Sequence, residues 1–350
     1  MNPTLKPSEI QTRKYSRLKL LAVLLTLFGI ALFGYFIYAV GFGEIVDGVG
    51  RFGFAGFAVI VVLYFFRLVV RALAWNACVH EPHELKLKDT LPAVVIGEAL
   101  SSTIPLGILI SGTAKAIVVR KRIPLVAAFS SVATENLFYS FVTSLFLIAG
   151  ATVMLRTYVV DESLILTINV LIAIVAILLS LGILMVVRQW HFASWIVNWL
   201  YDKGFLKRLL ENGRGEVRRF EDLIYGFYRK YPQRFLPVCL LEGLYHALGI
   251  AEVWYILSRI ADVAPSLLNA FLLESVSRLV TIIFKLVPFV IGVDEAGAQF
   301  VGETVALGAG VAVTLAIIRK GRILFWTAIG VVLIIKRGLS IKDISSALDE

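Results

Sequence analysis

The chain has 350 residues, of which 59% are hydrophobic and 17% charged, and its formal net charge is +9. Soluble domains are about 45 to 50% apolar, so this composition, with a mean hydropathy of +0.85, excludes an ordinary soluble domain and indicates a polytopic membrane protein. The basic residues gather before the first apolar run and between 188 and 234, which is the positive-inside pattern of a membrane protein and not a nucleic-acid interface. Cys78 and Cys239 lie far apart in apolar segments, so we expect no disulfide framework, no metal site and no cofactor.

Residues 1–19 form a basic tail, and the apolar run at 20–40 has 21 residues, enough to span a membrane core of about 30 Å. A cleaved signal peptide has an apolar region of about 7 to 15 residues, so we expect a retained helix and a cytosolic N-terminus. A short external loop then leads to a second span at 52–79. His80 and His83 follow it without the spacing of a helical zinc motif, and no metal binding is predicted there.

The stretch at about 90–119 predicts a first re-entrant hairpin. Its limbs on either side of Pro105 and Gly107 are about 15 residues long, too short to cross the membrane. Broken backbone at membrane depth is tolerated only where protein buries it or where it lines a water-filled site. Apolar segments at 124–155 and 164–187 then predict two full crossings.

Residues 188–235 mix basic and aromatic side chains and predict a cytosolic interfacial segment that lies on anionic headgroups. A span at 236–260 follows, and a second hairpin is expected at about 267–303, entering from the opposite side of the membrane. A helix at 308–335 returns the chain to the cytosol, where 338–350 form a tail.

The predicted fold is therefore all-α and polytopic, with about six full transmembrane helices and two re-entrant helical hairpins. The hairpins belong to two membrane halves, 20–187 and 236–337. At matching positions of the two hairpins the charged residues have opposite signs. A glycine stands three residues before Lys115 in the first hairpin and three residues before Glu295 in the second. Interrupted segments at corresponding positions indicate an inverted repeat with a binding site near the bilayer midplane.

Ionisable side chains inside these segments are the candidate site, because a charge near the bilayer centre costs about 2.5 to 3.5 kcal/mol and normally faces a cavity or a partner. The candidates for a headgroup cavity are Glu98, Lys115, Glu135, Arg278, Lys285, Glu295 and Arg319. The sign inversion predicts ion pairs between the halves: Glu98 with Arg278, Lys115 with Glu295, and Glu135 with Arg319. These pairs either only hold the halves together or line a cavity that receives a charged headgroup.

Two further pairs are one helical turn apart. Glu242 and His246 are candidates for a proton relay, the alternative being a helix-packing contact. Arg67 and Arg71 lie near the cytosolic end of their span, where we expect them to snorkel to the interface, the alternative being a contact with lipid phosphate.

Three motifs carry a family resemblance. They are the P-x-x-x-x-x-x-G-x-x-K step from Pro105 to Lys115, the ATEN sequence at 133–136, and VPFVIGVDEAG at 287–297. With them the chain, from about 15 to 337, resembles the transmembrane region of lysylphosphatidylglycerol synthases, a flippase-like family. The resemblance implies a lipid-handling protein; in bifunctional members this region is associated with flipping aminoacylated phosphatidylglycerol between leaflets. No aminoacyltransferase domain follows in this sequence, so we do not expect synthase activity.

We expect a flippase or transporter of the bacterial inner membrane, with both termini cytosolic, for a charged-headgroup lipid such as a phospholipid or an aminoacyl-phosphatidylglycerol. Lys115, Arg278 and Arg319 would bind phosphate. The candidate acids Glu98, Glu135 and Glu295 would pair with those cations or receive a cationic headgroup. One alternative is a non-catalytic partner of a separate lipid-synthesising enzyme. Another is a membrane-embedded lipid-modifying enzyme with Glu98 or Glu295 as general base. Ser101, Ser102 and Ser111 have no histidine nearby in sequence, so no catalytic residue is expected.

Overall fold

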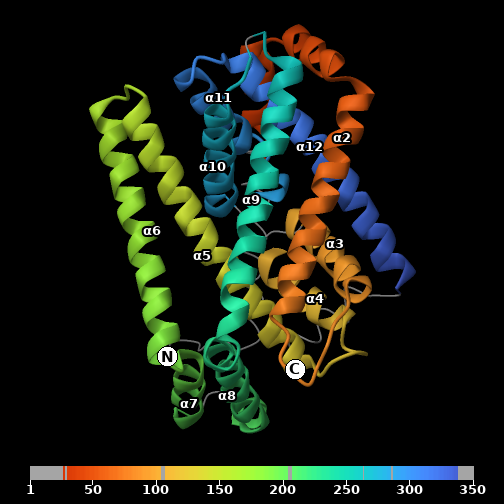
Figure 1. Cartoon of the computed structure of the whole chain (residues 1–350), viewed down its shortest axis with the longest axis vertical. Coiled ribbons are helices and arrows are strands. Elements are labelled where there is room, and N and C mark those ends of the chain that lie inside the picture. The colour runs from red at the N-terminus through yellow and green to blue at the C-terminus, as the bar shows by residue number, and fades with distance from the viewer. Residues whose placement is uncertain are drawn as a thin grey trace, which may run out of the picture.

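The described part of the chain is helical, in agreement with the predicted all-α fold (Figure 1). The computed structural model describes residues 27, 30–103, 107–203, 207–262, 264–284 and 287–337. Four helices are long and apolar enough to cross a membrane: α2 (Phe42–Ala77), α5 (Leu125–Thr157), α6 (Glu162–Arg188) and α9 (Pro232–Ile260). They contain four of the six predicted crossings.

The other two predicted crossings are not among these four apolar helices. The last one corresponds to α12 (Ala309–Lys336), a helix of 28 residues that buries three cations close together, Arg319, Lys320 and Arg322, and so falls outside the purely apolar class. Of the first one, 20–40, the structure describes residues 27 and 30–40, and the latter form the apolar helix Ile30–Val40.

The segment predicted as an external loop at 41–50 is helical and is the beginning of α2. Gly53, at φ 67°, bends α2 where this short part meets the long span. Glycine takes such an angle without a steric penalty, which allows the change of direction. Ile45 and Gly48 are buried, and Gly48 lies against Thr314 of α12, so tertiary packing orders a segment that its glycines make look like a loop.

Two broken helix pairs stand where hairpins were predicted. The first consists of α3 (Leu87–Thr103) and α4 (Gly107–Val118), of 17 and 12 residues. The second consists of α10 (Leu267–Ile283) and α11 (Val293–Thr304), also of 17 and 12 residues. A 17-residue helix is roughly 26 Å long, slightly short of the membrane core. The break in the second pair contains the short 3-10 helix Pro288–Val290.

The two broken pairs lie at opposite ends of the bundle (Figure 1). The helices α2 and α9 pack side by side and run in opposite directions, with α3–α4 at the lower end and α10–α11 at the upper end. Each pair packs against the next long helix, since α4 contacts α5 and α11 contacts α12. Each is also covered from the other half, because α3 packs against α12 and α10 against α5.

Glycines bring these helices close together. A Cβ added at Gly330 of α12 would lie 2.9 Å from the backbone oxygen of Val95 in α3, and one at Gly150 of α5 would lie 2.6 Å from the Cβ of Ser275 in α10. Small residues allow the close backbone approach by which membrane helices associate.

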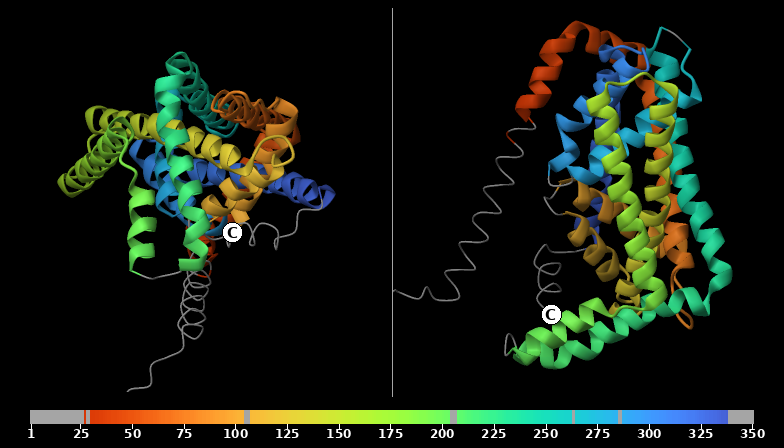
Figure 2. Two further views of the ribbon diagram at one scale, coloured as in Figure 1. Left: turned by 90° about the horizontal axis from the view of Figure 1, so that it is seen from below. Right: turned by 90° about the vertical axis from the view of Figure 1, so that its left-hand side faces the viewer.

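The remaining helices extend from the bundle. The apolar helix α6 packs against α5, and its most apolar window has no buried residue, so most of its surface faces outward. The pair α7 (Phe192–Asp202) and α8 (Lys207–Lys230) lies across the lower end, at a steep angle to the long helices (Figure 2). Phe227 of α8 packs against Phe138 of α5. This is the segment predicted to rest on anionic headgroups, and that role stays a prediction.

Candidate functional site: a buried charge network

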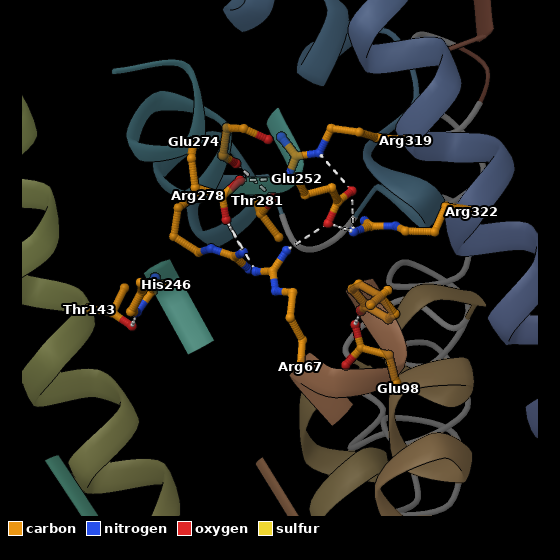
Figure 3. A network of polar contacts seen from close by, with 12 residues as sticks. Arg67, Glu98, Thr143, His246, Glu252, Glu274, Arg278, Thr281, Arg319 and Arg322 are labelled. Atoms are coloured by element: carbon orange, nitrogen blue, oxygen red, sulfur yellow. Dashed lines mark hydrogen bonds and ion pairs between the residues drawn. The ribbon is translucent and has the colours of Figure 1, made fainter. Parts of the chain in front are cut away.

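Two glutamates of the second half form the centre of a buried charge network (Figure 3). Glu252 of α9 and Glu274 of α10 are both 0% exposed. Arg67 of α2, 1% exposed, reaches both of them: its Nη1 lies 3.2 Å from an oxygen of Glu252, and its Nη2 lies 3.2 Å from an oxygen of Glu274. The network therefore joins the first half of the chain to the second.

Three further arginines complete the network. Arg278, one turn along α10, donates to Glu274 at 2.7 Å, and Arg319 of α12 donates to the other oxygen of Glu274 at 2.6 Å. Arg322 of α12 donates to Glu252 at 2.6 Å. Four arginines against two glutamates leave a formal excess of two positive charges in these six side chains.

Glu98 lies at the edge of this network. It accepts a hydrogen bond of 2.7 Å from the Tyr64 hydroxyl, and the Tyr64 ring lies 3.9 Å from the guanidinium carbon of Arg322. With Glu98 counted, four cations still face three acids, so the neighbourhood keeps an excess of positive charge.

A second cluster lies between α2, α4 and α5. Glu135 is fully buried, accepts a hydrogen bond of 2.9 Å from Arg71, and lies 3.7 Å from the ammonium group of Lys115. Glu242 of α9 is also 0% exposed, and neither of its carboxylate oxygens has a hydrogen-bond partner among the described residues.

Tyr245 connects the two clusters. Its ring lies 4.3 Å from the guanidinium of Arg67, 5.5 Å from that of Arg278 and 5.7 Å from that of Arg71. Cations within about 6 Å of an aromatic ring are attracted to its face. An aromatic side chain thus shares its face among cations that repel one another.

A third cluster lies where α11 begins. The Lys320 ammonium of α12 lies 3.0 Å from Glu295 and 3.7 Å from Asp294. Glu295 also accepts a hydrogen bond of 2.8 Å from the backbone of Gly292, which caps α11 after the break.

The candidates pair within each half and not as the sign inversion predicted. Lys115 pairs with Glu135 instead of Glu295, and Arg319 pairs with Glu274 instead of Glu135. The reason is that α4 and α11 lie at opposite ends of the bundle, while each packs directly against the long helix that follows it (Figure 1). The two halves do carry these pairs with the charges exchanged. In the first half a lysine of α4 pairs with an acid of α5, and in the second half an acid of α11 pairs with a lysine of α12.

The other predicted residues fall in several places. Glu98 and Arg278 lie at the central network, where Tyr64 and Glu274 are their respective partners. His246 bonds to Thr143 at 3.0 Å, and the structure gives Glu242 no hydrogen-bond partner among the described residues, so no hydrogen bond links the two candidates for a relay. Lys285 lies outside the described residues.

Sequence reasoning placed Arg67 and Arg71 at the interface, and this was wrong. Arg67 is 1% exposed and Arg71 forms an ion pair with the buried Glu135, because both face acids that are distant in sequence. Glu252, Glu274 and Arg322 were not selected as candidates at all. The rule that found the others, an ionisable residue within an apolar segment, would have found these as well.

Fold and network together define a multi-pass α-helical membrane protein with ionisable side chains buried between its halves. Over residues 19–330 the sequence matches the family model described as the lysylphosphatidylglycerol synthase TM region, and the chain belongs to that family. Neither the comparison with curated proteins nor that with solved structures found a match.

Proposed function

We propose that this protein moves a lipid with a charged headgroup between the leaflets of the membrane. The observation that carries the proposal is the excess of buried guanidinium groups, where four arginines share two fully buried glutamates. Uncompensated charge at this depth is costly, so it is expected where an anionic group binds. A lipid phosphate supplies that charge.

The arginines have hydrogen-bonding capacity left for a phosphate. The Nε atoms of Arg67, Arg278 and Arg322 are buried and have no hydrogen-bond partner within the described structure. Arginine binds phosphate through paired N–H donors in a fixed geometry, and such charge-assisted bonds are stronger than neutral ones. Aminoacyl-phosphatidylglycerol would also present a cationic amine, for which Glu98 at the edge of the network is a candidate partner.

The arrangement of the broken pairs supports a transport mechanism. We interpret α3–α4 and α10–α11 as re-entrant hairpins of an inverted repeat, because they have equal helix lengths, lie at opposite ends of the bundle and make reciprocal contacts with α12 and α5. Inverted repeats allow alternating access around a fixed site. A headgroup that replaces an internal glutamate as the partner of an arginine would supply the difference in affinity that the change of state requires.

A proton is the coupling ion that the buried acids favour. Glu242 is buried beside the Arg71–Glu135 pair, and its two oxygens have no hydrogen-bond partner in the described part of the chain, an arrangement that a protonated acid tolerates far better than a carboxylate. We propose that Glu242 takes up and releases a proton during transport. The test is lipid movement under an imposed pH gradient, in which Glu242→Gln is expected to remove the response to the gradient while movement without one persists.

The remaining assignments follow from charge and composition. We propose a bacterial inner-membrane location with α7 and α8 on the cytosolic side, because positive residues concentrate there. We assign no catalytic residue, and a lipid-synthesising enzyme would supply the transported lipid.

The test is transbilayer movement of a panel of lipids in liposomes that contain only the purified protein. The panel contains anionic, zwitterionic and aminoacylated phospholipids, and the variants are Arg278→Gln and Arg319→Gln. Hydrogen bonds to charged groups contribute about 1.5 to 3 kcal/mol, so each variant is expected to slow movement of the preferred lipid by about 10- to 100-fold.

Arg51→Gln is the matched control, because Arg51 forms an exposed ion pair with Asp262 and should transport normally. All variants must elute from a sizing column as the unaltered protein does. Absence of lipid movement by the unaltered protein, or full movement by both network variants, would reject the proposal. If movement then appears only on adding a lipid-synthesising enzyme, the protein is the non-catalytic partner.

A further inference from the structure

A groove of about 300 Å³ opens between α5, α9 and α10. It is lined by Val142, Leu145, Phe146, Gly243, His246, Ala247, Ile250 and Phe271. All of these except His246 are apolar or lack a side chain. The groove lies partway along the candidate spans α5 and α9, so we expect it to face the hydrocarbon of the bilayer, and Leu145 at its rim is 47% exposed.

The inner wall of the groove adjoins the charge network. Phe146 stacks on the His246 ring at 4.6 Å, and two further aromatic rings lie near it, Tyr139 at 5.9 Å and Tyr245 at 5.5 Å. Tyr245 in turn contacts the guanidinium of Arg67 at 4.3 Å. One layer of aromatic rings therefore separates the groove from the buried arginines.

Helix α10 provides a second connection. Phe271 lines the groove, Glu274 follows three residues later and Arg278 seven residues later, so all three lie on one face of the helix. A molecule with an apolar chain in the groove and an anionic group attached to it would place that group toward Arg278.

His246 contributes a polar atom to this wall. The ring is 2% exposed, its Nε2 lies 3.0 Å from the Thr143 hydroxyl, and its Nδ1 has no hydrogen-bond partner among the described residues (Figure 3). When the Thr143 hydroxyl donates to Nε2, the hydrogen of the neutral ring is on Nδ1. A buried donor without an acceptor costs about 1 to 3 kcal/mol, so an acceptor from a bound molecule would stabilise this arrangement.

We propose that the groove is the binding site for an acyl chain of a diacyl phospholipid, with His246 Nδ1–H donating to the ester carbonyl at the head of that chain. The proposal rests on the proposed function in one respect, namely that the phosphate of the lipid binds to Arg278 and Arg67. Three properties select this occupant over a protein helix or a free anion: the apolar lining, one hydrogen-bond donor at the inner end, and the excess of positive charge one ring layer further in.

The first experiment measures binding by photolabelling. Phosphatidylglycerol with a diazirine in one acyl chain is reconstituted with the protein, irradiated, and the labelled peptides are identified. Label is expected on groove residues of α5, α9 and α10, and Leu145→Trp, which fills the rim, should reduce it by severalfold. Ala247→Trp fills the inner groove as a second variant, and Leu166→Trp on the exposed surface of α6, where Leu166 is 67% exposed, is the control that should label normally.

The second experiment isolates His246. The unaltered protein should prefer the diester lipid to its diether analogue, which has no ester carbonyl, by about tenfold in competition for the photolabel, the equivalent of about 1.4 kcal/mol. His246→Gln keeps a polar group that can reach Thr143 but removes Nδ1, so it should bind the two lipids equally. Equal binding of both lipids by the unaltered protein would overturn the role of His246.

The two proposals fail in different ways. Label spread evenly over the outer surface, or unaffected by both tryptophan variants, overturns the acyl-chain site even if the protein moves lipid. Groove labelling that the tryptophans remove, in a protein that moves no lipid, supports the acyl-chain site and rejects the flippase.

Discussion

Arg67 of α2 donates a hydrogen bond of 3.2 Å to Glu274 of α10, across 207 positions of the chain. Glu274 has three guanidinium partners, whereas Arg67 is one of four cations that share two acids. The network therefore contains fewer acids than cations, so each glutamate neutralises more than one arginine. Removal of Glu274 and removal of Arg67 should have unequal consequences.

Glu274→Gln should destabilise the protein more than Arg67→Met. Removing one partner of a buried ion pair costs about 3 to 5 kcal/mol when the other charge is left uncompensated, and this describes the three arginines around a neutral side chain at position 274. After Arg67→Met, by contrast, both glutamates keep arginine partners. The measurement is the thermal unfolding midpoint in detergent, with the exposed Asp262→Asn as a near-neutral control. An equal or larger loss in Arg67→Met would contradict the proposed charge imbalance.

A charge exchange tests which lysine pairs with Glu295. Glu295→Lys places two cations at the start of α11 and should destabilise the protein; adding Lys320→Glu should recover part of the stability because the pair is restored with reversed sign. Recovery is incomplete, since Glu295 also caps the Gly292 backbone. Adding Lys115→Glu instead should give no recovery, as Lys115 pairs with Glu135. The measurement is the unfolding midpoint of each double variant. Rescue by Lys115→Glu would favour an ion pair between Lys115 and Glu295, across the two halves.

Gly330→Ala should weaken the contact between α12 and α3. The added methyl group would lie 2.9 Å from the backbone oxygen of Val95, which cannot move aside as a flexible side chain would. Overpacking of this kind costs typically about 1 to 3 kcal/mol. Gly182→Ala on α6 is the matched control, because, apart from its chain neighbours and the backbone of its own helix, no atom of the described residues lies within 4 Å of its added Cβ. Equal unfolding midpoints for the two variants would show that the helices separate readily at Gly330.

His80, in the loop after α2, should make the docking of α8 sensitive to pH. Burial, with repulsion from Lys230 and Arg234, lowers the pKa of His80 below its ordinary value of 6.5, and its ring packs against Phe227 and Tyr231. The undocked form therefore binds more protons than the docked form as the pH falls below about 6.5, so docking is fully stable above that pH and weakens below it.

The test is amide hydrogen exchange at the end of α8 at about pH 7.5 and about pH 5.5. Unaltered protein and His80→Phe are compared at each pH, so that the intrinsic pH dependence of exchange cancels. The unaltered protein should lose protection relative to His80→Phe only at the lower pH. A constant difference between the two proteins would exclude titration of His80 as the cause.

The sequence determined where most of the membrane helices lie and where the two broken pairs are interrupted. Hydrophobic runs and breaks at Pro and Gly predicted hairpins at about 90–119 and 267–303, and the broken pairs span Leu87–Val118 and Leu267–Thr304. These features are local, because the length of an apolar run and the backbone limits of Pro and Gly do not depend on distant residues. The same local reasoning missed the helical start of α2, which packing against α12 orders.

Tertiary structure decided which charges meet. The sequence identified Arg278, Arg319 and Glu295 as buried charges, because an apolar context is visible along the chain, but it assigned them partners across the halves that they do not have. Partner choice depends on which helices pack side by side and on the few ångströms over which a charge interaction is strong in a medium of low dielectric constant. Packing α2 against α9, with α10 and α12 alongside, brings Arg67 to Glu252 and Glu274, and so forms the network.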